Sequence, residues 1–203
     1  MIKNIVFDLG NVILKSTPKI ILNNIEMTKE KKEIIETTFF NNWEQLDLGY
    51  ITIAEHLNKC GLPSDIIENY REILINYYKF RPFNMDIIEL IHSLKRNNYN
   101  IYILSNNNLE TYEYLKTLPL FKSIDGWVVS CNYNVMKPDK RIYEILFHKY
   151  NIDPSASFFI DDKNENIATG KALGMDGHVL QYEKYGICKL VKDLTINGID
   201  CSF

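Results

Sequence analysis

With 203 residues, of which 46% are hydrophobic and 24% are charged, the chain is long enough for one globular domain with an insertion or for two small domains. A formal net charge of −3 gives no electrostatic argument for a nucleic-acid partner, and no apolar run approaches the roughly 20 residues that span a membrane. Four widely spaced cysteines without a CxxC pair argue against a zinc site or a disulfide scaffold, and with no signal peptide visible they favour the cytoplasm.

The first element is a short apolar run over residues 2–7, which is rich in β-branched side chains and stops at Asp8. Such a run, closed by Gly10, predicts a buried strand with Asp8 at its carboxyl end, where an open parallel sheet binds its ligands. Gly10 allows the backbone to approach a ligand closely. Asp8 is therefore a candidate nucleophile or metal ligand, although a carboxylate at this place could equally cap the following turn.

The stretch that follows carries helical patterns and no strand candidate. Within it, Thr52 and Glu55 have the spacing of a capping box at the start of a helix. We therefore expect an all-helical domain over residues 15–82, inserted into a core that is formed by residues 1–14 and 83–203. Insertions at the carboxyl edge of a parallel sheet lie over the active site and can act as a lid.

Strand and helix patterns alternate through the rest of the chain. The expected strands cover residues 101–104, 127–130, 157–160 and 178–180, and the expected helices cover residues 86–95, 109–118, 138–150, 166–173 and 187–194. This alternation predicts an α/β fold, in which a parallel sheet carries helices on both faces. The first strand is expected to join the same sheet.

Polar residues follow four of these strands: Asp8, Ser105 with Asn106, Lys137, and Asp161 with Asp162. Because the carboxyl ends of parallel strands share one edge of the sheet, these side chains should converge. Each one alone has an ordinary structural alternative, such as a helix cap for Ser105 or a solvated loop position for Lys137. Their joint placement at successive strand ends is what indicates a site.

The converging groups suit chemistry on a phosphate ester. Asp8 can attack phosphorus to give an aspartyl-phosphate. Ser105, Lys137 and the backbone N–H groups that follow Asp8 can hold the phosphoryl oxygens. Together with Asp8, the acidic pair Asp161 and Asp162 offers the hard oxygen ligands that Mg²⁺ prefers.

These residues stand in four motifs by which the chain resembles the haloacid dehalogenase superfamily: Phe7-Asp8-Leu9-Gly10-Asn11-Val12, Leu104-Ser105-Asn106, Lys137-Pro138, and Phe159-Ile160-Asp161-Asp162. The resemblance covers the whole chain, with residues 15–82 standing where the family inserts its helical cap. It implies a Rossmann-like core with the strand order 5-4-1-2-3, dependence on Mg²⁺, and hydrolysis through an aspartyl intermediate. The form of the first motif is most similar to that of sugar-phosphate phosphatases such as glucose-1-phosphatase.

The resemblance also implies roles for single residues. The catalytic residues would be Asp8, Ser105 and Lys137, the substrate would be bound by Leu9, Gly10, Ser105, Asn106 and Lys137, and the metal would be held by Asp8, the Gly10 carbonyl, Asp161 and Asp162. Of the acidic pair, Asp162 is favoured as the direct metal ligand and Asp161 as its support. The implied function is that of a Mg²⁺-dependent phosphatase acting on a small phosphorylated metabolite, a sugar phosphate in the first place.

One position departs from the pattern of the family's phosphatases. Most of them carry a second aspartate two positions after the nucleophile as general acid and base, and this chain has Gly10 there. The leaving group then departs without proton assistance unless water or a residue of the insertion supplies the proton. Two alternatives stay open: a metal-independent 2-haloacid dehalogenase, which would not need the acidic pair, and a non-catalytic relative that binds a phosphorylated ligand or a protein.

The sequence of the insertion does not identify the substrate. Trp43, Asp47, Tyr50 and His56 are candidates to face the cleft, although an aromatic side chain on a helical segment is more often part of a core. The sequence also leaves the oligomeric state open.

Overall fold

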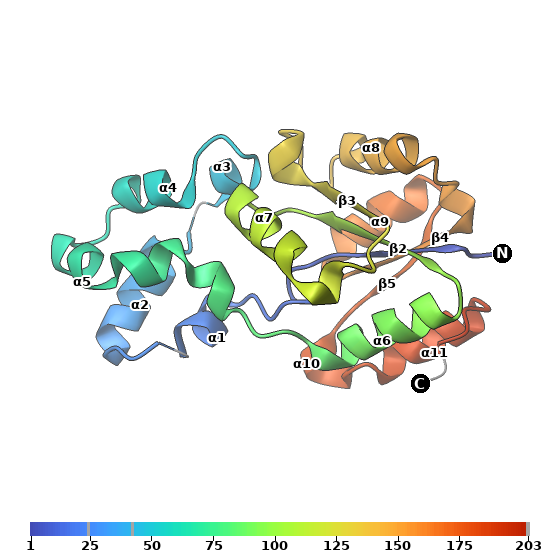
Figure 1. The fold of residues 1–203 in the computed structure, drawn as a ribbon, viewed down its shortest axis with the longest axis horizontal. Helices are drawn as coiled ribbons and strands as arrows, with labels where there is room; N and C mark the ends of the chain where they lie inside the picture. Colours follow the sequence, from blue (N-terminus) through green and yellow to red (C-terminus); the bar gives the residue numbers. More distant parts are fainter. Residues whose placement is uncertain (24, 42, 202–203) are drawn as a thin grey trace.

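The computed structural model describes residues 1–23, 25–41 and 43–201. Its centre is a five-stranded sheet in the order β3-β2-β1-β4-β5 (Figure 1), with the strands β1 (Asn4–Phe7), β2 (Asn100–Ser105), β3 (Gly126–Val129), β4 (Ser157–Asp161) and β5 (Asp176–Val179). All neighbouring strands are parallel. The predicted α/β fold is confirmed, because 5-4-1-2-3 is this same order counted from the other edge.

The register of the central strand aligns the strand ends. Phe7 of β1 stands opposite Ile103 of β2 and Ile160 of β4. The residue after Phe7 is therefore level with the residue after Ile160, which brings Asp8 and Asp161 to the same height at the carboxyl edge of the sheet. All four residues of β1 are buried, as a strand covered on both faces requires.

Two hydrophobic clusters fix the helices on the two faces of the sheet. Successive side chains of a strand point to opposite faces, so Ile5 and Phe7 belong to one cluster and Val6 to the other. The first cluster includes residues of α6 (Met85–Arg96), α7 (Leu109–Thr117) and α11 (Cys188–Ile196). The second includes residues of α8 (Lys140–Tyr150) and α9 (Asn164–Ala172).

The stretch between β1 and α6 is helical, as its sequence pattern predicted. It contains α1 (Pro18–Asn23), α2 (Lys29–Thr38), α3 (Glu44–Asp47), α4 (Ile53–Lys59), α5 (Ser64–Ile75) and the 3₁₀ helix η1 (Tyr77–Phe80). A separate hydrophobic cluster runs through these helices from Ile21 to Tyr77. The capping box of α4 is confirmed: the Thr52 hydroxyl accepts from the Glu55 N–H at 3.2 Å, and Glu55 Oε2 accepts from the Thr52 N–H at 2.8 Å. The exact limits of an inserted domain, 15–82, stay a prediction.

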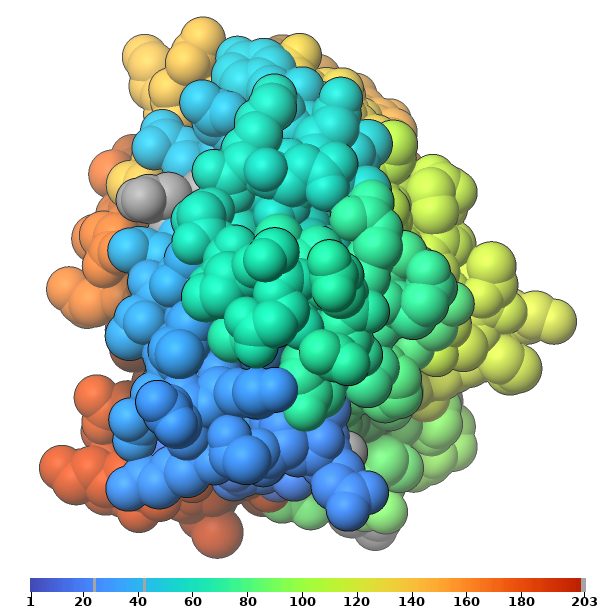
Figure 2. All heavy atoms as spheres, turned by 90° about the vertical axis from the view of Figure 1, so that its left-hand side faces the viewer, coloured from blue at the N-terminus to red at the C-terminus, as the bar shows by residue number. Residues whose placement is uncertain are grey.

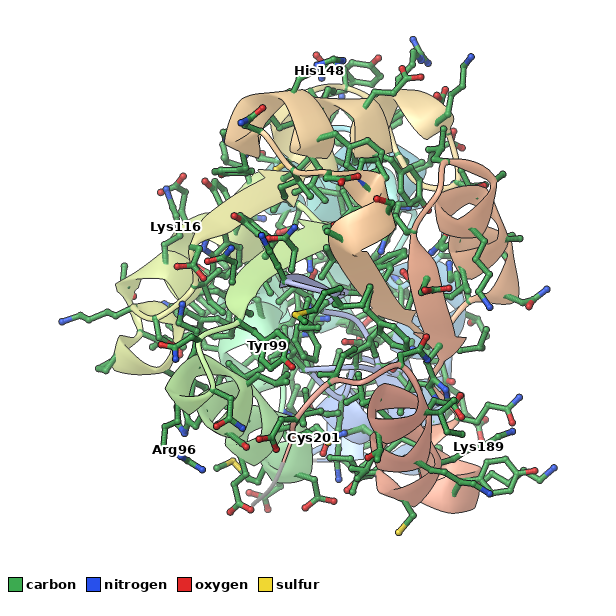
Figure 3. The ribbon with its side chains drawn as sticks, turned by 90° about the vertical axis from the view of Figure 1, so that its right-hand side faces the viewer. Arg96, Tyr99, Lys116, His148, Lys189 and Cys201 are labelled. Atoms are coloured by element: carbon green, nitrogen blue, oxygen red, sulfur yellow. The ribbon has the colours of Figure 1, made fainter. Side chains whose placement is uncertain are left out.

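This helical stretch lies beside the carboxyl ends of the strands (Figure 1, left). Seen from that side, its residues, coloured blue to green, spread over the end of the sheet (Figure 2). The opposite end of the molecule carries Tyr99 and Cys201 (Figure 3), and there the Asp200 N–H donates to Tyr99 Oη at 2.9 Å. The carboxyl edge of the sheet is thus the part of the core that the helical stretch can reach.

Local signals explain where the elements differ from the sequence expectation. Helix α8 begins at Lys140 and not at Pro138, because the Asp139 side chain accepts from the Arg141 N–H at 2.9 Å and so acts as its N-cap. Ser130, expected at the end of a strand, begins a 3₁₀ helix. Helix α10 was not predicted. The remaining short elements are η2 (Pro119–Phe121), η3 (Ser130–Asn132), η4 (Pro154–Ala156) and α10 (Tyr182–Tyr185). Within the described ranges, no helix is long and apolar enough to cross a membrane.

Candidate active site

Asp8 is placed by the end of β1 and by the turn that follows it. Its N–H donates to the carbonyl of Ile160 at 2.9 Å, which continues the pairing with β4. The carbonyl of Leu9 then accepts from the N–H groups of Ile13 at 3.0 Å and Leu14 at 2.8 Å, and this closes a tight turn. Asp8 is 6% exposed. The carboxylate is therefore held almost out of solvent at the edge of the sheet.

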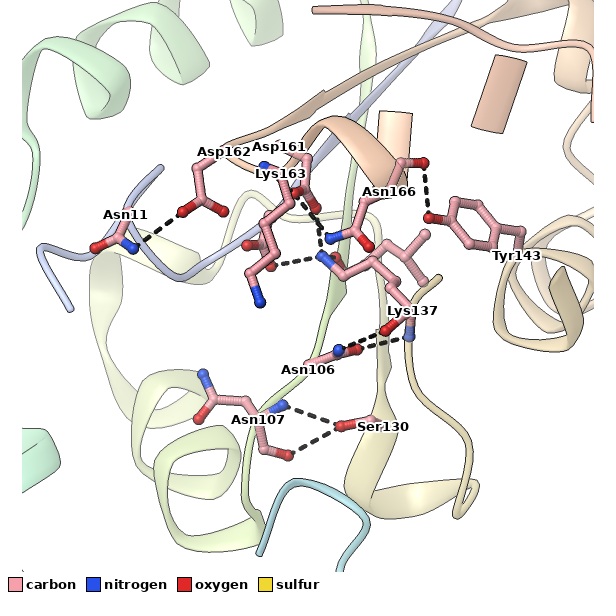
Figure 4. A network of polar contacts seen from close by, with 12 residues as sticks. Asn11, Asn106, Asn107, Ser130, Lys137, Tyr143, Asp161, Asp162, Lys163 and Asn166 are labelled. Atoms are coloured by element: carbon pink, nitrogen blue, oxygen red, sulfur yellow. Dashed lines mark hydrogen bonds and ion pairs between the residues drawn. The ribbon is translucent and has the colours of Figure 1, made fainter. Parts of the chain in front are cut away.

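Lys137 connects the strand ends at the centre of the site (Figure 4). Its Nζ lies 2.8 Å from Asp8 Oδ1 and 2.6 Å from Asp161 Oδ2, and it donates to the Leu104 carbonyl at 2.8 Å. Burial alone would lower the pKa of Lys137, but the two neighbouring carboxylates outweigh burial and raise it. The lysine is therefore a fixed positive charge between two buried carboxylates.

Replacing this lysine is expected to destabilise the fold. In Lys137→Met the carboxylates of Asp8 and Asp161 stay buried without their cation, which typically costs about 3–5 kcal/mol of unfolding free energy. The loss should be largest near pH 8 and smaller near pH 5, because burial already raises the pKa of Asp8 to about 6 and a protonated Asp8 needs no cation. Urea unfolding of the parent and the variant at both pH values measures this loss of unfolding free energy.

A matched control for that variant is Lys95→Met. Lys95 Nζ lies 2.7 Å from Asp125 Oδ2, but both side chains of this pair are partly exposed. An exposed pair of this kind contributes less than about 1 kcal/mol. Equal losses in the two variants would contradict the role of Lys137 as the cation that the buried carboxylates require.

Asn106 positions Lys137. Its Nδ2 donates to the Lys137 carbonyl at 2.9 Å, and its Oδ1 accepts from the Lys137 N–H at 2.8 Å. The side-chain amide, predicted from the sequence to bind substrate, is thus engaged in both directions by the backbone of Lys137. Asn106 also lines the cleft described below, so its predicted contact with the substrate stays a prediction.

The two aspartates at the end of β4, Asp161 and Asp162, differ in burial and in the number of their hydrogen-bond partners. Asp161 Oδ1 accepts from the Lys163 N–H at 2.8 Å and from Asn166 Nδ2 at 2.9 Å, while Oδ2 faces Lys137. Asp162 is partly exposed, and its Oδ2 accepts from Asn11 Nδ2 at 3.0 Å. Both oxygens of Asp161 therefore have partners in the protein, and the roles of Asp161 and Asp162 toward a metal stay predictions.

Asp8, Asp161 and Asp162 together form a potential metal-binding cluster. One carboxylate oxygen from each residue lies within 4.8 Å of the others. Burial raises the pKa of Asp8 to about 6, opposed by Lys137, and burial also raises the pKa of Asp162. Three carboxylates exceed the single charge of Lys137, so a hard divalent cation bound among them would offset the excess negative charge. The donor set fits Mg²⁺.

The other residues predicted at this edge, Ser105, Leu9 and Gly10, differ in burial and in access to the cleft. The Ser105 side chain is fully buried, and its hydroxyl has no hydrogen-bond partner among the described residues. Leu9 is buried in the first cluster, so only its backbone can serve a ligand. Gly10 lines the cleft, and a Cβ there would lie 3.8 Å from Asp8 Oδ2 and 3.8 Å from Ser16 Oγ, an ordinary contact distance. A side chain is thus sterically compatible with position 10.

A cleft of about 490 Å³ lies above these groups, between the sheet edge and the helical stretch. Two of the four candidates from the insertion, Trp43 and Asp47, line this cleft. Tyr50 is 61% exposed and does not line it. His56 is buried, and its Nε2 lies 2.7 Å from the Phe39 carbonyl, so this histidine belongs to the helical core.

Several residues of the cleft were not singled out from the sequence. Arg81 is 7% exposed, donates to Ser16 Oγ, and its Nε has no hydrogen-bond partner within the described part of the chain. Burial lowers its pKa, while the charges of Tyr77, Asp47 and Asp8 oppose that shift. The one sequence signal was its position before Pro82, where the chain returns to the core. The other cleft residues that were not singled out are Ser16, Glu44, Asn107, Lys163 and Glu165.

Comparison with known proteins agrees with this architecture. Over residues 2–174 the chain matches the family model for haloacid dehalogenase-like hydrolases. It is 26% identical to a sesquiterpene phosphatase of Aspergillus oryzae, over 86% of this chain and 88% of that protein. It is also 26% identical to a D-ribitol-5-phosphate phosphatase of Bacteroides thetaiotaomicron, over 87% and 90% respectively.

Solved structures share the fold. A haloacid dehalogenase family enzyme of Bacteroides thetaiotaomicron, solved with magnesium and inorganic phosphate, superposes with a TM-score of 0.67 at 24% identity, covering 89% of this chain and 95% of that one. The L-2-haloacid dehalogenase of Xanthobacter autotrophicus also superposes, with a TM-score of 0.66 at 18% identity, covering 98% and 85%. With the family model spanning most of its length and the four motif residues converging on one edge of the sheet, the chain belongs to the haloacid dehalogenase-like hydrolases.

Proposed function

We propose that this protein is a Mg²⁺-dependent phosphatase that hydrolyses a small phosphorylated metabolite through an aspartyl-phosphate. The favoured substrate class is a sugar phosphate. The observation that carries the proposal is the cluster of Asp8, Asp161 and Asp162 around Lys137. A metal-independent dehalogenase has no need of three converging carboxylates. The phosphatases among the relatives support the same choice.

The residues that would hold Mg²⁺ are Asp8, the carbonyl of Gly10 and Asp162, with Asp161 supporting them from behind. Bound there, the cation would reduce the repulsion between the Asp8 carboxylate and the negative charge of a phosphate. The magnesium and phosphate in the related Bacteroides structure support this assignment.

The remaining chemistry belongs to the protein. An Asp8 oxygen attacks phosphorus, the bond from phosphorus to the ester oxygen breaks, and the ester oxygen takes up a proton and leaves as the alcohol. Water then attacks the aspartyl-phosphate, which frees Asp8 and gives inorganic phosphate. In this proposal Lys137, the Ser105 hydroxyl, and the backbone N–H groups of Leu9 and Gly10 hold the phosphoryl oxygens. The buried hydroxyl of Ser105, which has no hydrogen-bond partner in the described part of the chain, suits a donor that is needed by a ligand.

The polarity of the cleft supports a hydroxylated leaving group. Asp47, Arg81 and Asn107 line it together with Trp43, so that several hydrogen-bonding groups surround one aromatic side chain. The polyol phosphate in the name of the Bacteroides relative agrees with such a cleft, whereas the Aspergillus relative is named for a terpenoid substrate. The proposal includes a cytoplasmic location, which suits the free thiols of Cys60, Cys131, Cys188 and Cys201.

A substrate screen tests the proposed function. Release of phosphate from sugar, polyol, aryl and terpenyl phosphates, and release of halide from 2-haloacids, should be measured with Mg²⁺ and with excess chelator. We expect phosphate release that requires Mg²⁺, fastest with a sugar or polyol phosphate. Halide release that persists in chelator would overturn the proposal in favour of a dehalogenase, and no turnover of any compound would favour a binding protein.

A further inference from the structure

The proposed reaction needs a proton donor, and the first motif does not supply one at position 10. When the ester bond breaks, an alkoxide is a poor leaving group unless it receives a proton in the transition state. Position 10, where the family's phosphatases carry that acid, is a glycine. The proton therefore has to come from water or from another group that faces the cleft.

The acidic groups that line the cleft from the helical stretch are Glu44 and Asp47, the first and the last residue of α3. Glu44 is exposed, while Asp47 is partly buried. Four charges from other parts of the chain act on Asp47: those of Arg81, Asp8, Lys163 and Lys137. Asp47 thus belongs to the same electrostatic environment as the nucleophile.

The core holds Asp47 in place. Ser130 of η3 donates its hydroxyl proton to the Asp47 carbonyl, and Asn134 Nδ2 donates to the next carbonyl, that of Leu48, at 2.6 Å. Gly49 then lies directly on η3: a Cβ there would be 2.3 Å from the Cys131 carbonyl oxygen. Three consecutive residues at the end of α3 therefore contact the core, so the position of Asp47 over the cleft is fixed by the core itself.

We propose that Asp47 is the general acid and base of this enzyme, and that it replaces the aspartate which the first motif lacks. The inference rests on the proposed phosphatase function. In the first step the bond from Asp8 to phosphorus forms, the ester bond breaks, and the Asp47 carboxyl proton passes to the ester oxygen to give the alcohol. In the second step the Asp47 carboxylate takes a proton from the attacking water, and the bond from phosphorus to Asp8 breaks.

The protonation behaviour of Asp47 supports this role. Burial raises the pKa of Asp47 from its ordinary value of 3.8 to about 7, and the guanidinium of Arg81 opposes that shift. A carboxyl group with this pKa is available near neutral pH both as an acid and as a base. Glu44 shares the helix and the cleft, which makes Glu44→Gln the matched control.

The test is a rate series over phosphate monoesters of graded leaving-group pKa, from nitrophenyl to simple alkyl phosphates. Asp47→Asn should slow the alkyl esters by about 10²–10³-fold and the nitrophenyl ester by less than about 10-fold, because a good leaving group needs no proton. The slope of rate against leaving-group pKa should therefore become steeper. Asp47→Glu should restore part of the loss, and Glu44→Gln should leave the slope unchanged.

Two outcomes separate this inference from the proposed function. If the protein releases phosphate but Asp47→Asn slows every ester equally, the inference fails and the phosphatase assignment stands. If no ester is hydrolysed, the phosphatase assignment itself fails. Gly10→Asp in the Asp47→Asn background adds a positive test, because position 10 has room for a side chain and a carboxyl there should flatten the slope again.

The pH dependence provides a second readout. With an alkyl ester, the kcat of the parent should fall as the pH rises through about 7. In Asp47→Asn this fall of kcat should be absent. The charged and titratable groups that interact with Asp47 are Arg81, Asp8, Lys163, Lys137, Tyr77 and Cys131, with Glu44 on its own helix. None of these groups is changed by Asp47→Asn, so an unchanged fall of kcat in the variant would overturn the assignment.

A third readout does not depend on activity. Because the pKa of Asp47 is higher in the folded than in the unfolded chain, its ionisation destabilises the fold as the pH rises from about 4 through 7. Asp47→Asn should therefore raise the urea midpoint relative to the parent at pH 8.5 more than at pH 5. An equal change at both pH values would contradict the perturbed environment that the assignment requires.

Discussion

Asp8→Asn is expected to lower the rate of phosphate release by about 10⁴-fold or more, because an amide oxygen cannot replace the carboxylate as the nucleophile. The variant should keep its fold. The amide fills the same volume, and Lys137 retains the Asp161 carboxylate at 2.6 Å and the Leu104 carbonyl at 2.8 Å. Steady-state rates with the best ester of the screen measure the effect, and circular dichroism with urea unfolding checks the fold.

The covalent step can be observed directly. Rapid acid quenching of the parent during turnover should give a chain that carries one phosphoryl group on Asp8, as located by peptide mass spectrometry. Asp176→Asn is a matched control, since Asp176 is an exposed carboxylate at the amino end of β5. If Asp8→Asn kept most of the parent rate, or if the phosphoryl group were found elsewhere, the assignment of the nucleophile would be wrong.

The convergence of the site was predictable because it follows from sheet geometry. A parallel sheet brings all carboxyl strand ends to one edge, so the order of strands and helices alone indicated that Asp8, Lys137 and Asp161 would meet. The structure brings these three within ion-pair distance. The assignment of Asp162 as direct metal ligand and Asp161 as its support stays a prediction; the structure shows that both oxygens of Asp161 are engaged by protein groups.

Residues that act through the tertiary contacts of loops were not predictable in this way. Asn11 donates to Asp162 from a backbone in the left-handed conformation, with φ of 55°, and a local sequence pattern does not predict which residue adopts that conformation. Arg81 is a charged residue that the fold buries, against the general tendency of arginine. No periodicity in the sequence reports such a burial.

The place of Asp47 depends on a contact between segments that are far apart in sequence. The carbonyl of Asp47 accepts from Ser130, and residues 47–49 lie against η3. Helical periodicity identified a helical stretch but not its contact with the core, because the face that docks is only one turn long. The sequence could name Asp47 as a candidate for the cleft, whereas its distinction from Tyr50 and His56 required the packed structure.

Asp162→Ala is expected to abolish Mg²⁺-dependent turnover, and excess chelator should do the same to the parent. Asp162 is the partly exposed member of the carboxylate cluster, and Asp161 is poorly placed to replace it, since both oxygens of Asp161 are engaged. Mg²⁺ affinity, measured by calorimetry with the metal alone, should fall by more than about 100-fold. Mutating a residue that only hydrogen-bonds to a metal ligand already lowers metal affinity by about 10–100-fold. This measurement does not require a known substrate.

Asn11→Ala tests the same metal site with a smaller expected effect. Asn11 Nδ2 donates to Asp162 Oδ2 at 3.0 Å, and Asn11 Oδ1 accepts from the Ser16 N–H at 3.1 Å, so the asparagine orients the proposed ligand without being one. Its loss should weaken Mg²⁺ binding by about 10–100-fold and leave kcat at saturating Mg²⁺ less affected than in Asp162→Ala. Glu113→Gln, which removes an exposed carboxylate paired with Lys116 on α7, should not change Mg²⁺ binding. Unaltered affinity in Asp162→Ala would place the metal elsewhere, and turnover that persists in excess chelator would show that the three carboxylates serve a reaction without a metal.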